Sequence, residues 1–318
     1  ASACAGPKFI AVDSVVAALN RRNLIVHLLI HPIMMIRREG DAVAEIVAVQ
    51  NARDAKFRPE SVMHIQIDQQ PSAAELSAIE ADLAAVLTDV RQTVTDWQKM
   101  RDAVDRAAQA LNKVPSTFDA EEAVEVKAFL DWLRADRFTF LGARQYVLAQ
   151  RGGKDYLDIV EGSGLGLLKT ISEESARRHA APLTPAELEF ARRARPLMIT
   201  KASSRATVHR PVYMDYLGLR QFNAAGAVTG ELRILGLFSS SAYIAAIADI
   251  PLLRRKAARV MARAGFPPGS HNAKALQHIL ETYPRDELFQ IDEDTLFDFA
   301  QGIDRKSTRL NSSHLGIS

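Results

Sequence analysis

Six cationic side chains lie between residues 191 and 210, and no acidic residue stands among them. At the centre of this segment, Lys201, Ser203, Ser204 and Arg205 could offer cations and hydroxyl groups to a carboxylate or a phosphate. These four residues are our candidate effector or anion site. The alternative interpretation of the same residues is a solvated loop.

A second set of arginines recurs every four residues in a segment with a helical pattern. Arg255, Arg259 and Arg263 would share one face of a helix, where like charges repel by a few tenths of a kcal/mol per pair. Segment 281–298 supplies seven acidic residues. We therefore expect an ionic contact within the chain or between domains, with a solvated face as the alternative. Nucleic-acid binding is disfavoured because aromatic residues do not alternate with these cations.

Other motifs indicate no chemistry. The glycine-rich string at 162–166 lacks dinucleotide-loop spacing, because Leu167 stands where the third glycine is needed. Gly152 and Gly153 predict a plain turn. His271 and His278 lie two helical turns apart, roughly 10 Å, which is too far for one metal ion. The sequence thus predicts no catalytic, cofactor-binding or metal-binding residue.

Composition is typical of a globular chain of about two domains, with 318 residues, 47% hydrophobic and 25% charged. The longest uncharged, mostly apolar run, 23–36, contains two histidines and a proline and is shorter than the ~20 residues of a membrane span. The single cysteine, Cys4, excludes an internal disulfide. Together with the lack of a signal-peptide pattern at the start, this favours a cytoplasmic protein without a membrane segment.

The last segment, 304–318, is rich in serine and has no helical or alternating pattern. It resembles the in-frame translation of a sequencing-library adapter, so we expect an artefactual tail and leave it out of the fold analysis. Without Asp304, Arg305, Lys306 and Arg309, the 40 basic and 38 acidic residues become 37 and 37. The rest of the chain is neutral and gives no electrostatic reason to expect a nucleic-acid partner.

The first part of the chain predicts a small sheet under helices. Asp13 is a candidate N-cap for a helix that reaches Arg22. Branched and alternating residues predict strands at 23–30, 44–49 and 61–68. With the helix that follows, this pattern favours a βαβ-type sandwich.

The clearest periodic signal spans residues 72–111. Ser72 and Glu75 have capping-box spacing, and ten of eleven positions taken every three or four residues from Leu76 are apolar. A helix of about 40 residues would be roughly 60 Å long. Its apolar stripe needs cover, which we expect from a second helix or another subunit. The alternative is a break near Asp89 that gives two stacked helices.

After Pro115 the pattern predicts a helix, an antiparallel meander and then closing helices. Thr184 and Glu187 form a second capping-box pair, with Pro185 between them. The expected helices are 119–135, 184–195, 251–264, 270–282 and 292–300, and the expected strands are 138–150, 155–160, 196–200, 207–222 and 227–239. The overall prediction is an α+β fold.

Several longer strings together resemble one known family. They are FIAVDSVVAAL (9–19), FTFLG (138–142), GLGLLK (164–169), TVHRPVYMDYLGLRQF (207–222), GELRILGLFSSSAY (230–243), IPLLRRK (250–256) and SHNAKALQHILETYPRDELFQI (270–291). In this order, over nearly all of 8–303, they resemble the N-terminal regulatory region of the very large NAD-specific glutamate dehydrogenases of bacteria. Ala143 and Gln145 depart from the pattern after FTFLG.

The resemblance implies a domain organisation: an ACT-like α/β module at 8–70, a long helical connector at 71–136, a PAS-like antiparallel sheet at 137–248 and a helical linker at 249–303 towards a further module. It also implies an enzyme that oxidises L-glutamate with NAD and water to 2-oxoglutarate, ammonia and NADH, with its catalytic residues in a later segment. The expected partners are further copies of the chain, the downstream catalytic domain and a small amino-acid effector. The alternative is a stand-alone sensor of small molecules.

Overall fold

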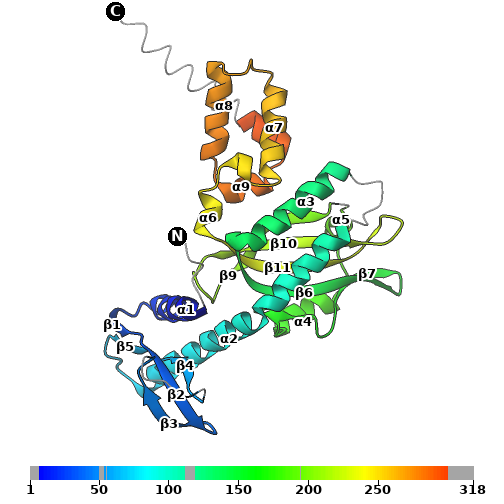
Figure 1. The fold of residues 1–318 in the computed structure, drawn as a ribbon. Helices are drawn as coiled ribbons and strands as arrows, with labels where there is room; N and C mark the ends of the chain where they lie inside the picture. Colours follow the sequence, from blue (N-terminus) through cyan, green and yellow to red (C-terminus); the bar gives the residue numbers. More distant parts are fainter. Residues whose placement is uncertain (1–6, 50–53, 55, 112–118, 194, 300–318) are drawn as a thin grey trace, which may run out of the picture. The chain divides into compact units, whose positions relative to one another are not determined.

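The computed structural model describes residues 7–299 apart from 50–53, 55, 112–118 and 194. The segment 304–318, interpreted above as a tail, lies outside the described residues. The chain divides into two compact units, Ala1–Val94 with Arg205–Val212 and Thr95–Ser204 with Tyr213–Ser318. Helices and antiparallel strands occur in both, and the predicted α+β class is confirmed (Figure 1).

In the first unit, the strands of two small antiparallel sheets lie between two helices along the chain. Strands β1 and β5 pair with each other, and β2 pairs with β3 on one side and β4 on the other. The elements are α1 (Pro7–Arg21), β1 (Val26–Ile30), β2 (Ile33–Glu39), β3 (Ala42–Val47), β4 (Arg58–Ser61) and β5 (His64–Ile67). Strand β2 had no counterpart in the sequence analysis, because its mixture of apolar and basic residues follows Pro32 directly.

The expected packing of helices on a sheet is present in this unit. Val15 and Leu19 of α1 share a core with Ile79 of the long helix and with apolar residues of β1 and β5, including Val26 and Ile65. The order of elements differs from the expected βαβ unit. The described strands follow one another between α1 and the long helix, and all their pairs are antiparallel.

The long helix, α2, runs without interruption from Ala73 to Ala110, so the break considered near Asp89 is absent. Ser72 caps it, because the Glu75 backbone N–H donates to Ser72 Oγ (3.2 Å), and the Ser72 hydroxyl in turn donates to the Glu75 carboxylate (3.1 Å). The predicted stripe is largely buried, with Met100 fully covered, whereas Leu76 is 54% exposed. Strands and helices of this chain pack on the stripe. The expectation from the sequence was a second helix or another subunit.

The second unit contains a sheet in the order β7-β6-β11-β10-β9, with the short β8 also paired to β6 (Figure 1). The strands are β6 (Phe138–Arg151), β7 (Lys154–Ile159), β8 (Leu165–Gly166), β9 (Leu197–Arg205), β10 (Tyr213–Phe222) and β11 (Val228–Phe238). Gly152 and Gly153 connect β6 to β7 with positive φ angles of 55° and 75°, as a two-residue hairpin turn requires. The predicted turn is confirmed.

One face of this sheet is apolar and packs on helices. Leu217, Leu232 and Ile234 share a core with Val104 of α2 and Phe129 of α3 (Ala120–Trp132). Asp119 caps α3 by accepting a hydrogen bond from the Glu121 N–H (3.0 Å). Helix α3 continues as the π-helical turn η3 (Leu133–Arg137), which leads into β6.

Two short helices follow β8. Helix α5 (Pro185–Arg192) begins at Thr184 with the expected capping box, in which Thr184 and Glu187 bond each other's backbone N–H groups. Helix α4 (Glu173–Ala180), capped by Ser172, had no counterpart in the sequence analysis. Its eight residues are mostly charged and small and carry no apolar stripe.

The last part of the unit is helical. It comprises α6 (Ser240–Tyr243), the 3-10 turn η4 (Ile247–Asp249), α7 (Leu253–Ala264), α8 (His271–Thr282), α9 (Arg285–Gln290) and a helical turn at 293–299. Leu253 and Val260 of α7 share a core with Leu280 of α8, Leu288 of α9 and Leu296. These amphipathic helices therefore bury their apolar stripes against one another.

Candidate functional site

The four residues of the candidate anion site are divided between the two units. Lys201, Ser203 and Ser204 lie on β9 in the second unit, whereas Arg205 begins the segment assigned to the first. Lys201 Nζ contacts Asp215 Oδ1 (2.6 Å) and Asp286 Oδ2 (2.8 Å). These two carboxylates raise the pKa of Lys201 although burial acts in the opposite direction. Its charge is therefore matched within the unit.

The three regularly spaced arginines of α7 contact acidic residues of the second unit. Arg259 lies 3.2 Å from Glu293, and Arg263 pairs with Asp294, both within the acidic segment 281–298. Arg255 instead pairs with Asp119 and Glu121 at the start of α3. All four pairs are partly exposed, so solvent screening keeps their contribution to stability small.

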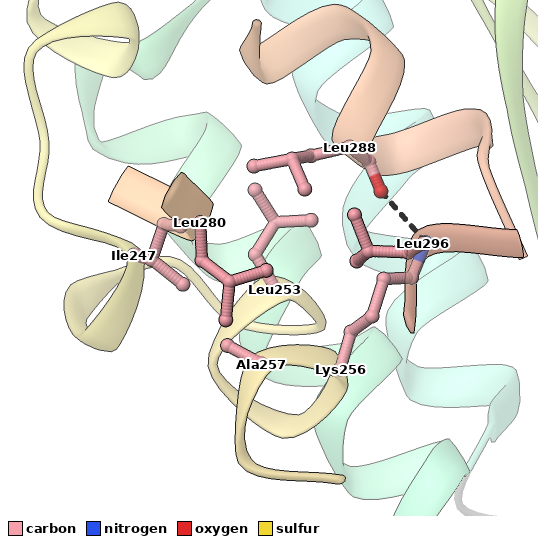
Figure 2. A pocket seen from close by; sticks show the side chains of 7 residues that line it. All are labelled: Ile247, Leu253, Lys256, Ala257, Leu280, Leu288 and Leu296. Atoms are coloured by element: carbon pink, nitrogen blue, oxygen red, sulfur yellow. Dashed lines mark hydrogen bonds between the residues drawn. The ribbon is translucent and has the colours of Figure 1, made fainter. Parts of the chain in front are cut away.

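A half-buried lysine lies beside this face. Figure 2 shows Lys256 among Leu253, Leu288 and other apolar side chains that line a cavity too small to admit a water molecule. Its Nζ donates to the backbone oxygens of Leu288 (2.7 Å) and Ile291 (2.6 Å), at the C-terminal end of α9. Burial lowers the pKa of Lys256 to about 8. The ammonium group caps α9 and needs no ligand for that role.

The glycine-rich string at 162–166 does not fit NAD. Gly166 pairs with Gly142 of β6, and a Cβ at this position would collide with the Leu141 carbonyl. The glycine therefore permits two strands to approach. The Gly166 N–H donates to the buried carboxylate Asp96 (3.3 Å), which Lys99 and Lys169 also contact. The Gly166 N–H is therefore engaged within the chain and is not free to bind a pyrophosphate.

The second face of the sheet carries a buried polar cluster that was not among the predicted site residues. At its centre, the Glu231 carboxylate on β11 is 1% exposed and accepts hydrogen bonds from Tyr216 and Arg220 of β10. Arg233 Nε lies 3.3 Å from the same carboxylate. Burial, with the negative charge of Glu231, raises the pKa of the Tyr216 hydroxyl, which therefore stays a hydrogen-bond donor.

The cluster continues onto β6 and α4. Arg144 is 2% exposed and donates to the backbone oxygens of Leu168 and Thr170 (3.0 Å to the latter). The Arg233 guanidinium lies 4.1 Å from the centroid of the Tyr146 ring, a cation–π contact. The His179 ring packs on the same tyrosine at 4.9 Å, and its Nδ1 lies 2.9 Å from the Leu157 oxygen.

Strand alternation is the signal that could have located this cluster. Glu231 and Arg233 alternate with Leu232 and Ile234, so the charged pair lies on the face opposite to the apolar core. Charged residues at alternate strand positions ordinarily indicate a solvated face. Here α5 covers the cluster, because Arg220 donates to the Phe190 oxygen (3.0 Å).

In the described part of the chain, no helix combines the length and apolar character needed to cross a bilayer. Within the same residues, no group of three or more His, Cys, Asp or Glu side chains is placed to hold a metal ion.

Two family models match the chain at its two ends. Residues 9–83 match the ACT1 domain of glutamate dehydrogenase, and residues 250–309 match its helical motif 1. The first match thus extends from α1 into α2, and the second covers the α7–α9 helices. Its last residues fall within the segment that resembles an adapter.

Curated relatives match over nearly the whole chain. NAD-specific glutamate dehydrogenases of Halomonas elongata and Pseudomonas aeruginosa are 36% and 35% identical to it, each over 94% of this chain, and that of Mycobacterium tuberculosis is 24% identical over 92%. The chain spans about a fifth of the length of these relatives, 17% to 19%. Nearly the whole chain is therefore similar to part of the NAD-specific glutamate dehydrogenases, and its two matched segments are similar to the ACT1 domain and helical motif 1 of glutamate dehydrogenase.

Proposed function

We propose that this chain is a regulatory region of an NAD-dependent glutamate dehydrogenase and is not itself catalytic. The match of residues 9–83 to an ACT1 domain carries the proposal. The whole protein would oxidise L-glutamate with NAD and water to 2-oxoglutarate, ammonia and NADH in the cytoplasm. The chain would act through small effectors, further copies of itself and a catalytic domain elsewhere in the protein.

The contacts of the described residues support a structural role. Lys201, Lys256 and the α7 arginines all contact carboxylates or backbone oxygens within their own unit. The proposed domain limits are 8–70, 71–136, 137–248 and 249–303, with the PAS-like character of the third segment as part of the proposal. The uninterrupted α2 supports a helical connector between the first two modules.

The test compares the 318-residue chain with a longer protein translated from the same reading frame. With glutamate and NAD, we expect NADH absorbance to rise for the longer protein and to stay constant for the chain. NADH formation by the chain alone would overturn the non-catalytic assignment. A longer protein without a dinucleotide-binding domain would instead favour the stand-alone sensor.

A further inference from the structure

The buried polar cluster of the second unit carries more positive than negative charge. Three of its side chains are guanidinium groups, Arg144, Arg220 and Arg233, and its carboxylate is Glu231, which Arg220 and Arg233 contact. Arg220 and Arg233 share this one carboxylate, and Arg144 donates to backbone oxygens, which carry no net charge. Two positive charges are therefore in excess in a region largely shielded from water.

An excess of this kind is costly for a protein without a counterion. Burying a charged group without a partner of opposite sign costs several kcal/mol, and backbone oxygens offset only part of that. The buried Nε of Arg220 has no hydrogen-bond partner within the structure. Apolar side chains of similar volume would stabilise the fold at least as well, so stability alone does not explain the cluster.

The same positive field extends to the edge of the cluster at α4. Burial lowers the pKa of His179, and the charges of Arg233, Arg144 and Arg178 lower it further, whereas the hydrogen bond to Leu157 acts in the opposite direction. Arg178 is exposed, and the Arg233 side chain remains 24% exposed between the rings of Tyr146 and Tyr216. The edge formed by Arg178, His179 and Arg233 is thus accessible from solvent.

We infer that this edge, formed by Arg178, His179 and Arg233 beside Arg144, binds a small oxyanion carrying two negative charges. A dicarboxylate or a phosphate group has this chemistry, and either would balance the two excess charges with charge-assisted hydrogen bonds. The ligand would lie beside α4 and the strands β6 and β11, away from the candidate site around Lys201. The binding itself is inferred from the structure, and only its role in regulating an enzyme rests on the proposed function.

The test is calorimetric titration of the 318-residue chain with succinate and, separately, with inorganic phosphate at constant ionic strength. We expect saturable binding of at least one. Arg233→Gln should weaken it by about tenfold or more, since a charge-assisted hydrogen bond contributes roughly 1.5–3 kcal/mol. Binding of succinate alone would identify a dicarboxylate site, and binding of phosphate alone would identify a phosphate site.

Arg151→Gln is the matched control. Arg151 also lies on β6 and stacks on a tyrosine, 4.3 Å from the Tyr156 centroid, but it pairs with Asp158 and is 56% exposed. This variant should bind like the original chain. Arg178→Gln, at an exposed position where the fold is not at risk, should weaken binding as well. Absence of binding to both probes, or equal binding by all variants, would overturn the inference without touching the dehydrogenase assignment.

Discussion

The ammonium group of Lys256 lies among leucine side chains, so its titration should make the free energy of unfolding depend on pH. Its pKa of about 8 in the folded chain lies below the ordinary value of 10.5. Between these two values the unfolded chain binds more protons than the folded chain, so stability rises with pH by up to about 1.4 kcal/mol per pH unit. Below about pH 8 the penalty for the buried charge is fully present.

The prediction is tested with Lys256→Met, which keeps an unbranched side chain, one atom shorter, and removes the charge. The unfolding free energy of the original chain, minus that of the variant, should increase from about pH 8 to pH 10. Chemical denaturation at a series of pH values measures this difference. A difference that stays constant over the range would contradict the assigned titration.

Glu231 should be the most sensitive carboxylate of the second unit. Glu231→Gln removes the negative charge that Arg220 and Arg233 share and should cost about 3 kcal/mol or more, since a broken buried pair leaves charge unmatched. Urea denaturation near neutral pH gives the value. Glu189→Gln, at a side chain 75% exposed, should change stability by less than about 0.5 kcal/mol. Equal effects of the two variants would contradict the central role of Glu231.

At the scale of elements, α2 shows that an apolar pattern predicts a helix but does not predict how deeply each position of the stripe is buried. Met100 is fully buried in the core of the second unit, whereas Leu76 is 54% exposed although both belong to the same predicted stripe. Met100→Ala should therefore cost about 2–5 kcal/mol, and Leu76→Ala less than about 0.5 kcal/mol. Denaturation midpoints of the two variants check this, and a larger loss for Leu76→Ala would contradict it.

The sequence located elements whose signals are local. Thr184 with Glu187, the Gly152–Gly153 turn and the stripe of α2 all depend on neighbours within a few residues, and the structure has all three. Strand β2 and helix α4 were missed because their sequences lack a periodic apolar face. The Glu231 cluster depends on partners from β6, β10 and α4, and strand alternation places Glu231 and Arg233 on one face without showing which side chains and helices meet that face.

At the scale of the whole molecule, the chain consists of two units that each have a core. Unfolding should therefore occur in two calorimetric transitions. Ile79→Ala, in the core of the first unit, should lower one melting temperature, and Leu217→Ala, in the core of the second, should lower the other. One transition shifted equally by both variants would contradict separate cores.

The hairpin between β6 and β7 gives experimenters a place to attach a reporter. A Cβ added at Gly152 or Gly153 would meet nothing within 4 Å, so the tip has room for additional chain. Short insertions are best tolerated at such exposed tips. A dye carried there would lie at the end of β6 and β7, the strands that contain Arg151 and Tyr156, and would report on this end of the sheet.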